Sequence, residues 1–237
     1  MKVVKIIILG LVLLTASTTG NPVAQAQTES QHKIVVLADT SGTNWGYEDF
    51  EALKEQFMVE LARLQENYFY AFSSVDVIET ATGRLIWSGS INEIQSPRGA
   101  ALKAAITAVK TNCNNLPRTF QTLDHHLKFI DGRQFSDIKI FVISNLYNTP
   151  VPCGKETRIV YPSLAPKEVD LNQILTQRPE ISSVIFLGAH EAQVKVWGDA
   201  LPDVVAWQQA GEGRIFRLYN VSQSIAALNQ GLEGMNP

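Results

Sequence analysis

Three short apolar segments constrain the fold of this chain more than any other feature of its sequence. They lie at residues 34–38, 137–144 and 184–188 and are rich in β-branched residues. Runs of this kind are typical of strands buried on both faces of a parallel sheet. Segments with helical periodicity or a high alanine content lie around them, at residues 47–65, 99–110, 118–129, 169–176, 201–209 and 222–232. Strands that alternate with helices predict a mostly parallel sheet covered by helices.

A hairpin interrupts this alternation. Residues 72–78 are strand-like, Thr82 and Gly83 mark a turn, and residues 84–87 resume the apolar pattern, which predicts two antiparallel strands. A further strand is expected at residues 214–218. We therefore expect an α/β fold of three layers, with a doubly wound, mostly parallel sheet, one antiparallel edge strand, and helices on both faces.

The N-terminal residues follow the order of parts in a secretory signal peptide. Lys2 and Lys5 precede an apolar run at residues 6–14, and Ala24 and Ala26 supply the small residues before a cleavage point. The run is about half of the roughly 20 residues that a membrane-spanning helix needs, which argues against a membrane anchor, and no later stretch is long and apolar enough to span a bilayer. We predict a signal peptide over residues 1–26, a flexible segment over residues 27–31 and a single α/β domain over residues 32–237. The protein is then expected to be exported, and to be periplasmic or secreted.

The charge balance narrows the class of partner. The chain has 20 Lys and Arg residues and 23 Asp and Glu residues. Without Lys2 and Lys5 the balance is 18 basic against 23 acidic residues, or −5. Binding to nucleic acid depends on a basic face that neutralises phosphates, so this balance argues against nucleic acid as the partner.

The chain has two cysteines, Cys113 and Cys153. In an oxidising compartment an even number favours a disulfide, with two separate, partly buried thiols as the alternative. Because helices in this kind of fold run antiparallel to the strands, we expect Cys113 to lie at the opposite end of the sheet from Asn145. The loop that carries Cys153 must then travel back along the domain to reach it.

Polar residues follow the apolar strands at the place where open α/β sheets bind ligands, beyond the carboxyl ends of the strands. The group Asp39-Thr40-Ser41-Gly42-Thr43 lies between a buried strand and an amphipathic helix. Mg²⁺ prefers six oxygen ligands. The hydroxyls of Ser41 and Thr43 are spaced to face one ion, and Asp39 supplies negative charge. The alternative is a hydroxyl-rich loop that caps the following helix.

This motif resembles the metal-ion-dependent adhesion site of the von Willebrand factor A domain family. That site opens with Asp-x-Ser-x-Ser, in which Thr can replace the last Ser, and Asp39, Ser41 and Thr43 match it in type and spacing. The family's site also uses a Thr from a later loop, for which Ser96 is a conservative match. Its last part is usually Asp followed by Gly, where this sequence has Asn145 followed by Leu. The resemblance covers the whole domain as an order of elements, whereas residue identity is confined to the first motif.

The resemblance implies a non-enzymatic, adhesion-type module that binds a protein partner through Mg²⁺ or Mn²⁺, because an acidic side chain of the partner completes the site in that family. Asn145 offers only a dipole where the family has a full charge, which implies weak metal binding. Trp45 is a candidate partner contact, with burial against its own helix as the alternative. His190, just past a strand, is a second candidate, with simple solvation as the alternative.

Two other hypotheses stay open. Asp-x-Ser-Gly-Thr after a strand also resembles the haloacid dehalogenase family of phosphatases, which implies that Asp39 is a nucleophile acting with Mg²⁺. Ser41 replaces the second aspartate of that family, which serves as general acid and base, and the hairpin fits that fold poorly. The third hypothesis is a scaffold in an envelope complex, with a loop that has lost its metal site.

Overall fold

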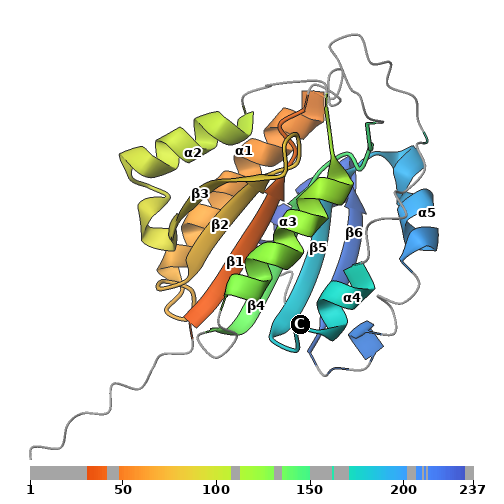
Figure 1. The fold of residues 1–237 in the computed structure, drawn as a ribbon. Helices are drawn as coiled ribbons and strands as arrows, with labels where there is room; N and C mark the ends of the chain where they lie inside the picture. Colours follow the sequence, from red (N-terminus) through yellow and green to blue (C-terminus); the bar gives the residue numbers. More distant parts are fainter. Residues whose placement is uncertain are drawn as a thin grey trace, which may run out of the picture.

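The computed structural model shows a twisted sheet between two layers of helices (Figure 1). It describes residues 31–41, 48–107, 113–130, 135–149, 162, 171–201, 207–209, 211 and 213–232. The strands are β1 (Gln31–Ala38), β2 (Ser74–Glu79), β3 (Arg84–Ser90), β4 (Phe135–Ile143), β5 (Ile181–Ala189) and β6 (Ile215–Asn220). The helices are α1 (Glu48–Arg63), α2 (Pro97–Thr107), α3 (Leu116–Phe129), α4 (Leu171–Thr176), α5 (Glu191–Ala200) and α7 (Val221–Leu228), with 3-10 turns η2 (Leu64–Glu66) and η3 (Ile91–Glu93).

The strand order in the sheet is β3-β2-β1-β4-β5-β6. Every neighbouring pair is parallel except β2 and β3, which are antiparallel. Val35 at the centre of β1 lies opposite Asp76 of β2 and Ile140 of β4. The predicted fold class is therefore confirmed, including its single antiparallel edge strand.

Two hydrophobic cores lie on the two faces of the sheet. Val36 packs in the core that α1, α2 and α7 cover, whereas Val35 and Leu37 pack in the core under α3, α4 and α5 (Figure 1). Phe50 and Phe57, from the apolar stripe expected for the first helix, are fully buried in the first core. Full burial of one such side chain contributes about 1.5–3 kcal/mol, so apolar contacts on both faces hold the sheet in place.

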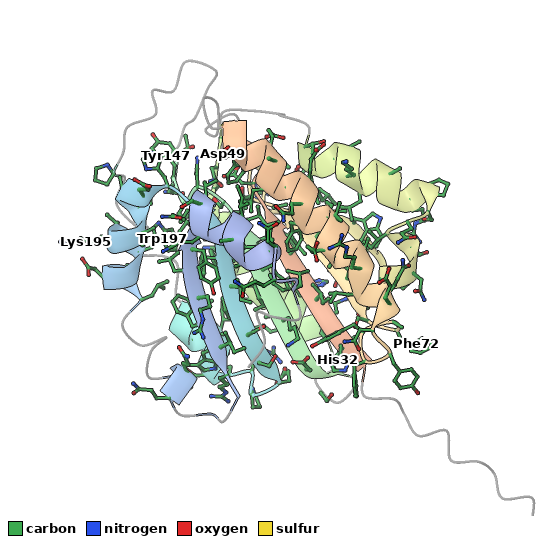
Figure 2. All side chains as sticks on the ribbon, turned by 180° about the vertical axis from the view of Figure 1, so that it is seen from behind. His32, Asp49, Phe72, Tyr147, Lys195 and Trp197 are labelled. Carbon is green, nitrogen blue, oxygen red and sulfur yellow. The ribbon has the colours of Figure 1, made fainter. Side chains whose placement is uncertain are left out.

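The parallel strands give the sheet two different ends. We call the carboxyl end the one where β1, β2, β4 and β5 finish, and the amino end the one where they begin. Asp49 and Tyr147 lie at the carboxyl end, and His32 and Phe72 lie at the amino end (Figure 2). Because β3 is antiparallel, it begins at the carboxyl end and finishes at the amino end, where Ser90 pairs with Ser74.

One helix differs from expectation. Of the helix expected over residues 201–209, residues 207–209 are helical and Leu201 lies outside any helix, while residues 202–206 lie outside the described part of the chain. The unexpected helix is α5, which follows β5 almost directly. Its buried residues are Gln193 and Trp197, and the polar Gln193 interrupts the apolar periodicity by which helices are recognised.

The chain's N-terminal expectations fall mostly outside the described residues. The predicted signal peptide, 1–26, is not described, and β1 begins at Gln31, the last residue of the segment expected to be flexible. Among the helices that the structure describes, none is long and apolar enough to cross a membrane.

Candidate functional site

The carboxylate of Asp39 is the centre of a polar cluster at the carboxyl end. Asp39 is the first residue after β1, is fully buried, and donates its backbone N–H to the carbonyl of Ile143 at 2.8 Å. Its Oδ1 accepts hydrogen bonds from the backbone N–H of Ser41 at 2.8 Å and from Ser41 Oγ at 2.6 Å. Its Oδ2 accepts from Asn114 Nδ2 at 2.9 Å and Ser144 Oγ at 3.0 Å. One carboxylate thus joins loops from three parts of the chain.

Burial dominates the electrostatics of this carboxylate. It raises the pKa of Asp39 above its ordinary value, and the hydrogen bonds from Ser41 and the positive charge of Lys54 offset only part of that rise. Lys54 belongs to α1, its side chain is fully buried, and its Nζ lies 3.2 Å from Glu51 Oε1. The cluster therefore contains a buried anion and, within its electrostatic reach, a buried cation.

A second buried carboxylate lies on the neighbouring strand. Glu79 ends β2 opposite Ala38 and is almost fully buried. It accepts hydrogen bonds from Thr82 Oγ1 at 2.5 Å and, more weakly, from Thr40 Oγ1 at 3.5 Å. Thr40 follows Asp39 in the chain, so its hydroxyl links the Asp39 motif to the Glu79 carboxylate.

Asn145 lies where the resemblance places a metal ligand, in a firmly held loop after β4. It is buried, and its Oδ1 accepts a hydrogen bond from the backbone N–H of Tyr147 at 2.9 Å. Leu146 is also buried and has a φ of 63°, a conformation that costs a residue with a Cβ energy. Its carbonyl accepts from Gln193 Nε2 at 2.8 Å and Trp197 Nε1 at 3.0 Å, so side chains of α5 hold this backbone in place.

His190 begins α5 and lies beside the same loop. Its backbone N–H donates to the carbonyl of Asn145 at 3.1 Å, and its Nδ1 accepts from the backbone N–H of Ala192 at 3.1 Å. Partial burial lowers the pKa of His190, and the charge of Glu191 opposes that shift. The imidazole is thus a helix cap at the carboxyl end of the sheet, which agrees with the expected position and adds a structural role.

Ser96 does not belong to the cluster. It follows β3 and η3, and Ile91 of that turn donates its N–H to the carbonyl of Ser73 at the amino end. Ser96 Oγ donates to the carbonyl of Glu93 at 2.6 Å and accepts from the N–H of Arg98. The expectation that Ser96 completes a site with Asp39 is therefore wrong, because the antiparallel β3 returns the chain to the other end of the sheet.

The same reversal corrects the expected position of Cys113. It precedes Asn114, whose N–H donates to Thr149 Oγ1 at 3.0 Å and whose carbonyl accepts from the N–H of Thr149 at 2.9 Å. Cys113 therefore lies at the same end as Asn145, not at the opposite end. It is not a free thiol, and Cys153 lies outside the described residues, so their pairing stays a prediction.

The sequence did not indicate Asn114 or Glu79 as residues of the cluster. In addition, two residues that it did indicate are not described. Asn114 and Asn115 precede α3 together, and a pair of this kind predicts a helix cap. Only Asn115 acts as one, accepting from the N–H of Arg118 at 3.1 Å, which leaves Asn114 to reach Asp39. Thr43 and Trp45 lie outside the described residues.

The donor atoms around Asp39 suit a hard cation. They are carboxylate, hydroxyl and amide oxygens, which Mg²⁺ and Mn²⁺ prefer. Asn114 Oδ1 and Thr80 Oγ1 are buried without a hydrogen-bond partner in the described part of the chain, which is rare in folded proteins and points to water or an ion. Across the residues that the structure describes, no group of three or more His, Cys, Asp or Glu side chains is placed to hold a metal. A cation here thus depends on hydroxyl and amide oxygens.

Comparison with known proteins finds similar folds but no similar sequence. No family model and no curated protein sequence matches the chain. Among solved structures, it is similar to a D319A mutant of the PilB minor pilin from Streptococcus sanguinis, with 12% identity and a TM-score of 0.52, over 85% of this chain and 60% of that one. It is also similar to the pilus adhesin SpaC from Lactobacillus rhamnosus GG in an open conformation, with 9% identity and a TM-score of 0.53, over 87% of this chain and 30% of that one. These similarities show a shared fold, and the chain spans less than two thirds of either protein.

Proposed function

We propose that the protein is an exported, non-enzymatic module of the adhesion type, which binds a protein partner at the carboxyl end of its sheet. The observation that supports this best is the buried Asp39 carboxylate with its four hydrogen bonds from Ser41, Ser144 and Asn114. These donors are held by loops from different parts of the chain, so the cluster is preformed. A fixed group of oxygens at the ligand-binding end of an α/β sheet is suited to a cation and to a partner that shares it.

The proposed ion is Mg²⁺ or Mn²⁺. Asp39 supplies the charge, Ser41 and Thr43 supply hydroxyls, and Asn145 and Asn114 supply amide oxygens. Asn145 provides no charge, and a unit charge missing at roughly 5 Å from a dication is worth about 6–7 kcal/mol at an effective dielectric near 20, before desolvation. Even a third of that weakens binding by more than about tenfold. The ion is therefore held weakly until an acidic side chain of the partner completes its coordination.

The partner is proposed to be a protein of the envelope or of the cell exterior. The fold shared with a minor pilin and a pilus adhesin supports an adhesion-type role. The proposed contact residues around the ion are His190, partly buried beside the Asn145 loop, and Trp45, which lies between β1 and α1 in the sequence.

Calorimetry with Mg²⁺ and with Mn²⁺ tests the metal site. We expect millimolar or weaker affinity for the wild type and at least about tenfold tighter binding for Asn145→Asp. Ser96→Asp is the matched control, because it adds the same charge at the amino end and keeps an oxygen that can cap α2. Micromolar binding by the wild type would contradict the charge argument, and no binding by any variant would favour the metal-free scaffold.

Crosslinking in the native compartment, with and without a chelator, tests the partner. We expect a crosslinked protein that is lost with chelator and in Asp39→Ala. A partner that is captured equally well under all conditions would support the scaffold hypothesis instead.

The phosphatase remains the second candidate function. A nucleophilic Asp39 needs access to substrate, and here both carboxylate oxygens accept hydrogen bonds inside the protein. Hydrolysis of a generic aryl phosphate that disappears in Asp39→Asn would support it against the binding module.

A further inference from the structure

An ordered turn between η2 and β2 exposes aromatic side chains at the amino end of the sheet. Tyr68 is 72% exposed, Phe69 71% and Phe72 61%, and the rings of Tyr68 and Phe69 meet edge to face with centroids 6.3 Å apart. Large aromatic side chains are usually buried in soluble proteins, and a group of exposed ones marks an interaction site.

Hydrogen bonds within the turn hold these side chains in their exposed positions. Asn67 Oδ1 accepts from the N–H of Phe69 at 2.9 Å, and the carbonyl of Asn67 accepts from the N–H groups of Tyr70 and Ala71 at 2.9 Å. Tyr70 packs inward, with its ring centroid 5.1 Å from that of His32. Tyr70 therefore anchors the turn on the domain, and its neighbours are held in an outward position.

The other face of the sheet presents a further aromatic side chain at the same end. Phe129, the last residue of α3, is 76% exposed, and α3 finishes beside the start of β4 (Figure 1). The basic residues nearest these aromatic side chains in the chain are Arg63 and Lys128, and each forms an ion pair with an acid of its own helix, Glu60 and Asp124. The described basic side chains that are nearest to these rings in the chain are thus paired with acids.

The position of β1 in the fold indicates what the exposed rings face. β1 begins at the amino end, close to Phe72 and His32 (Figure 2). Sixteen residues separate Gln31 from Leu14, the last residue of the apolar run that starts at Ile6, a span of at most about 55–60 Å. In the predicted signal peptide that run enters the membrane during export, so until cleavage after Ala26 the amino end is the part of the domain that is tethered near the bilayer.

We propose that the amino end is a docking surface for the lipid bilayer, in which Tyr68, Phe69 and Phe72 insert at the level of the headgroups. Aromatic residues favour this region because their rings tolerate both the apolar and the wet side of it. Since Arg63 and Lys128 are already paired with acids, insertion of the rings drives binding and anionic lipid adds little. The domain then rests on the membrane with the Asp39 cluster directed away from it. This proposal does not depend on the metal site.

Flotation with phosphatidylcholine vesicles, with and without phosphatidylglycerol, tests the proposal on the chain from Gln27 to Pro237. Both hydrophobic cores consist of residues from Ile34 onward, so this form keeps the whole fold and lacks the apolar run. We expect the wild type to float with both kinds of vesicle. The triple variant Tyr68→Ser, Phe69→Ser, Phe72→Ser is expected to lose at least about tenfold in partitioning, and Phe69→Ser alone to lose part of it.

The matched control removes apolar groups elsewhere on the surface. Val59 is 48% exposed and Leu85 45%, and the double variant Val59→Ser, Leu85→Ser is expected to float like the wild type. A wild type that does not float, a triple variant that floats unchanged, or a control that loses binding would each overturn the proposal. A dimer seen in sedimentation velocity that the triple variant abolishes would assign the surface to a second copy of the chain and also overturn it.

Discussion

Asn114 donates a hydrogen bond from Nδ2 to Asp39 Oδ2 at 2.9 Å, which ties the end of β1 to a loop 75 residues further along the chain. The same amide nitrogen donates to Ser144 Oγ at 3.2 Å, and the Asn114 backbone pairs with Thr149. A single side chain therefore connects the three loops that form the carboxyl end of the sheet. Its removal should affect the site and the fold together.

Asn114→Ala should destabilise the protein by about 1–3 kcal/mol, because it leaves a buried carboxylate oxygen with one donor fewer. The variant should also weaken Mg²⁺ binding further. Asn115→Ala is the matched control, since it removes only the cap of α3, with a cost of about 0.5–2 kcal/mol and no effect on the ion. Urea unfolding gives the first quantity and calorimetry the second. Equal metal binding by the two variants would show that Asn114 has no part in the site.

Asp39→Asn should make the protein more stable at pH 7 while it abolishes metal binding. Burial raises the pKa of Asp39, so its contribution to stability is present below the unfolded pKa of about 3.9 and is lost as the pH rises through the folded pKa. At neutral pH the ionised group is a cost, and its removal should add about 0.5–2 kcal/mol, the usual range when a functional group opposes stability. Asn114 can turn its unpaired Oδ1 toward the new amide.

Unfolding free energies of the wild type and of Asp39→Asn, measured from pH 7 to pH 4, check this expectation. The two curves should converge toward acid pH, where the wild-type carboxyl becomes neutral. A variant that is less stable than the wild type at pH 7 would mean that the four hydrogen bonds to the carboxylate outweigh its burial.

The sheet could be predicted from the sequence because burial on both faces leaves unbroken apolar runs, as in residues 34–38, and because a hairpin signal marks β3. The position of Asp39 at the carboxyl end of the sheet follows from the same pattern. Ser96 and Cys113 lie at the opposite ends of the sheet from those expected, because the order of helices does not report the direction of β3. An antiparallel strand returns the chain to the amino end, so α2 starts there and Cys113 and Asn114, which precede α3, lie at the carboxyl end.

The partners of Asp39 could be predicted only in part. Ser41 is local and belongs to a motif, whereas Asn114 is distant in the chain and has no spacing signal. Glu79 was missed because it closes β2, a strand that also holds the polar Ser74 and Asp76, so nothing in its spacing distinguishes it. Contacts of this kind depend on strand register, which periodicity does not report.

A buried ion pair on β2 should govern the acid stability of the fold. Asp76 is almost fully buried, its Oδ2 lies 2.5 Å from His126 Nε2, and it forms an ion pair with Lys33 of β1. Burial alone would raise the pKa of Asp76, but the hydrogen bonds from His126 and Lys33 outweigh it and lower the pKa to about 2. The stability that this group contributes is present above the unfolded pKa of about 3.9 and is lost as the pH falls through 2.

Asp76→Asn should cost about 3–5 kcal/mol at pH 7, because it leaves the charge of Lys33 buried without its partner. The variant should also show a flatter loss of stability between pH 4 and pH 2. Asp124→Asn, which breaks the more exposed pair with Lys128 on the same helix as His126, should cost about 1 kcal/mol or less. Similar losses in the two variants would show that burial of the Asp76 pair is not what matters.

The two cysteines should form a disulfide in an oxidising compartment. Cys113 lies beside Asn114, which pairs with Thr149, and Cys153 follows Thr149 by four residues, so no return path along the domain is needed. Reduction should cost about 3–4 kcal/mol in the chain-entropy model and should loosen the loop that carries Asn114. Intact mass should be lower by two hydrogens, and alkylation of the denatured protein should need a reductant. Two thiols that react without one would support the alternative of separate cysteines.

Lys54→Met should tighten Mg²⁺ binding. The Lys54 ammonium is buried in α1 and acts on the charge of Asp39, so an ion bound at Asp39 is repelled by a positive charge that the protein already holds. A dication and an ammonium roughly 8 Å apart repel by about 4 kcal/mol at an effective dielectric near 20, and a third of this is about tenfold in affinity. Methionine has a similar length and is suited to a buried position.

The control for this change is Lys54→Arg, which keeps the charge and should leave the affinity for Mg²⁺ unchanged. Lys54→Met should be less stable than the wild type without metal, since Asp39 loses a favourable charge, and Mg²⁺ should restore part of that stability through its binding to the folded state. Calorimetry measures the affinity, and the midpoint of thermal unfolding with increasing Mg²⁺ gives an independent measure of it. If Lys54→Met and Lys54→Arg bind Mg²⁺ equally, the ammonium does not act on the ion, and the weak affinity must come from Asn145 alone.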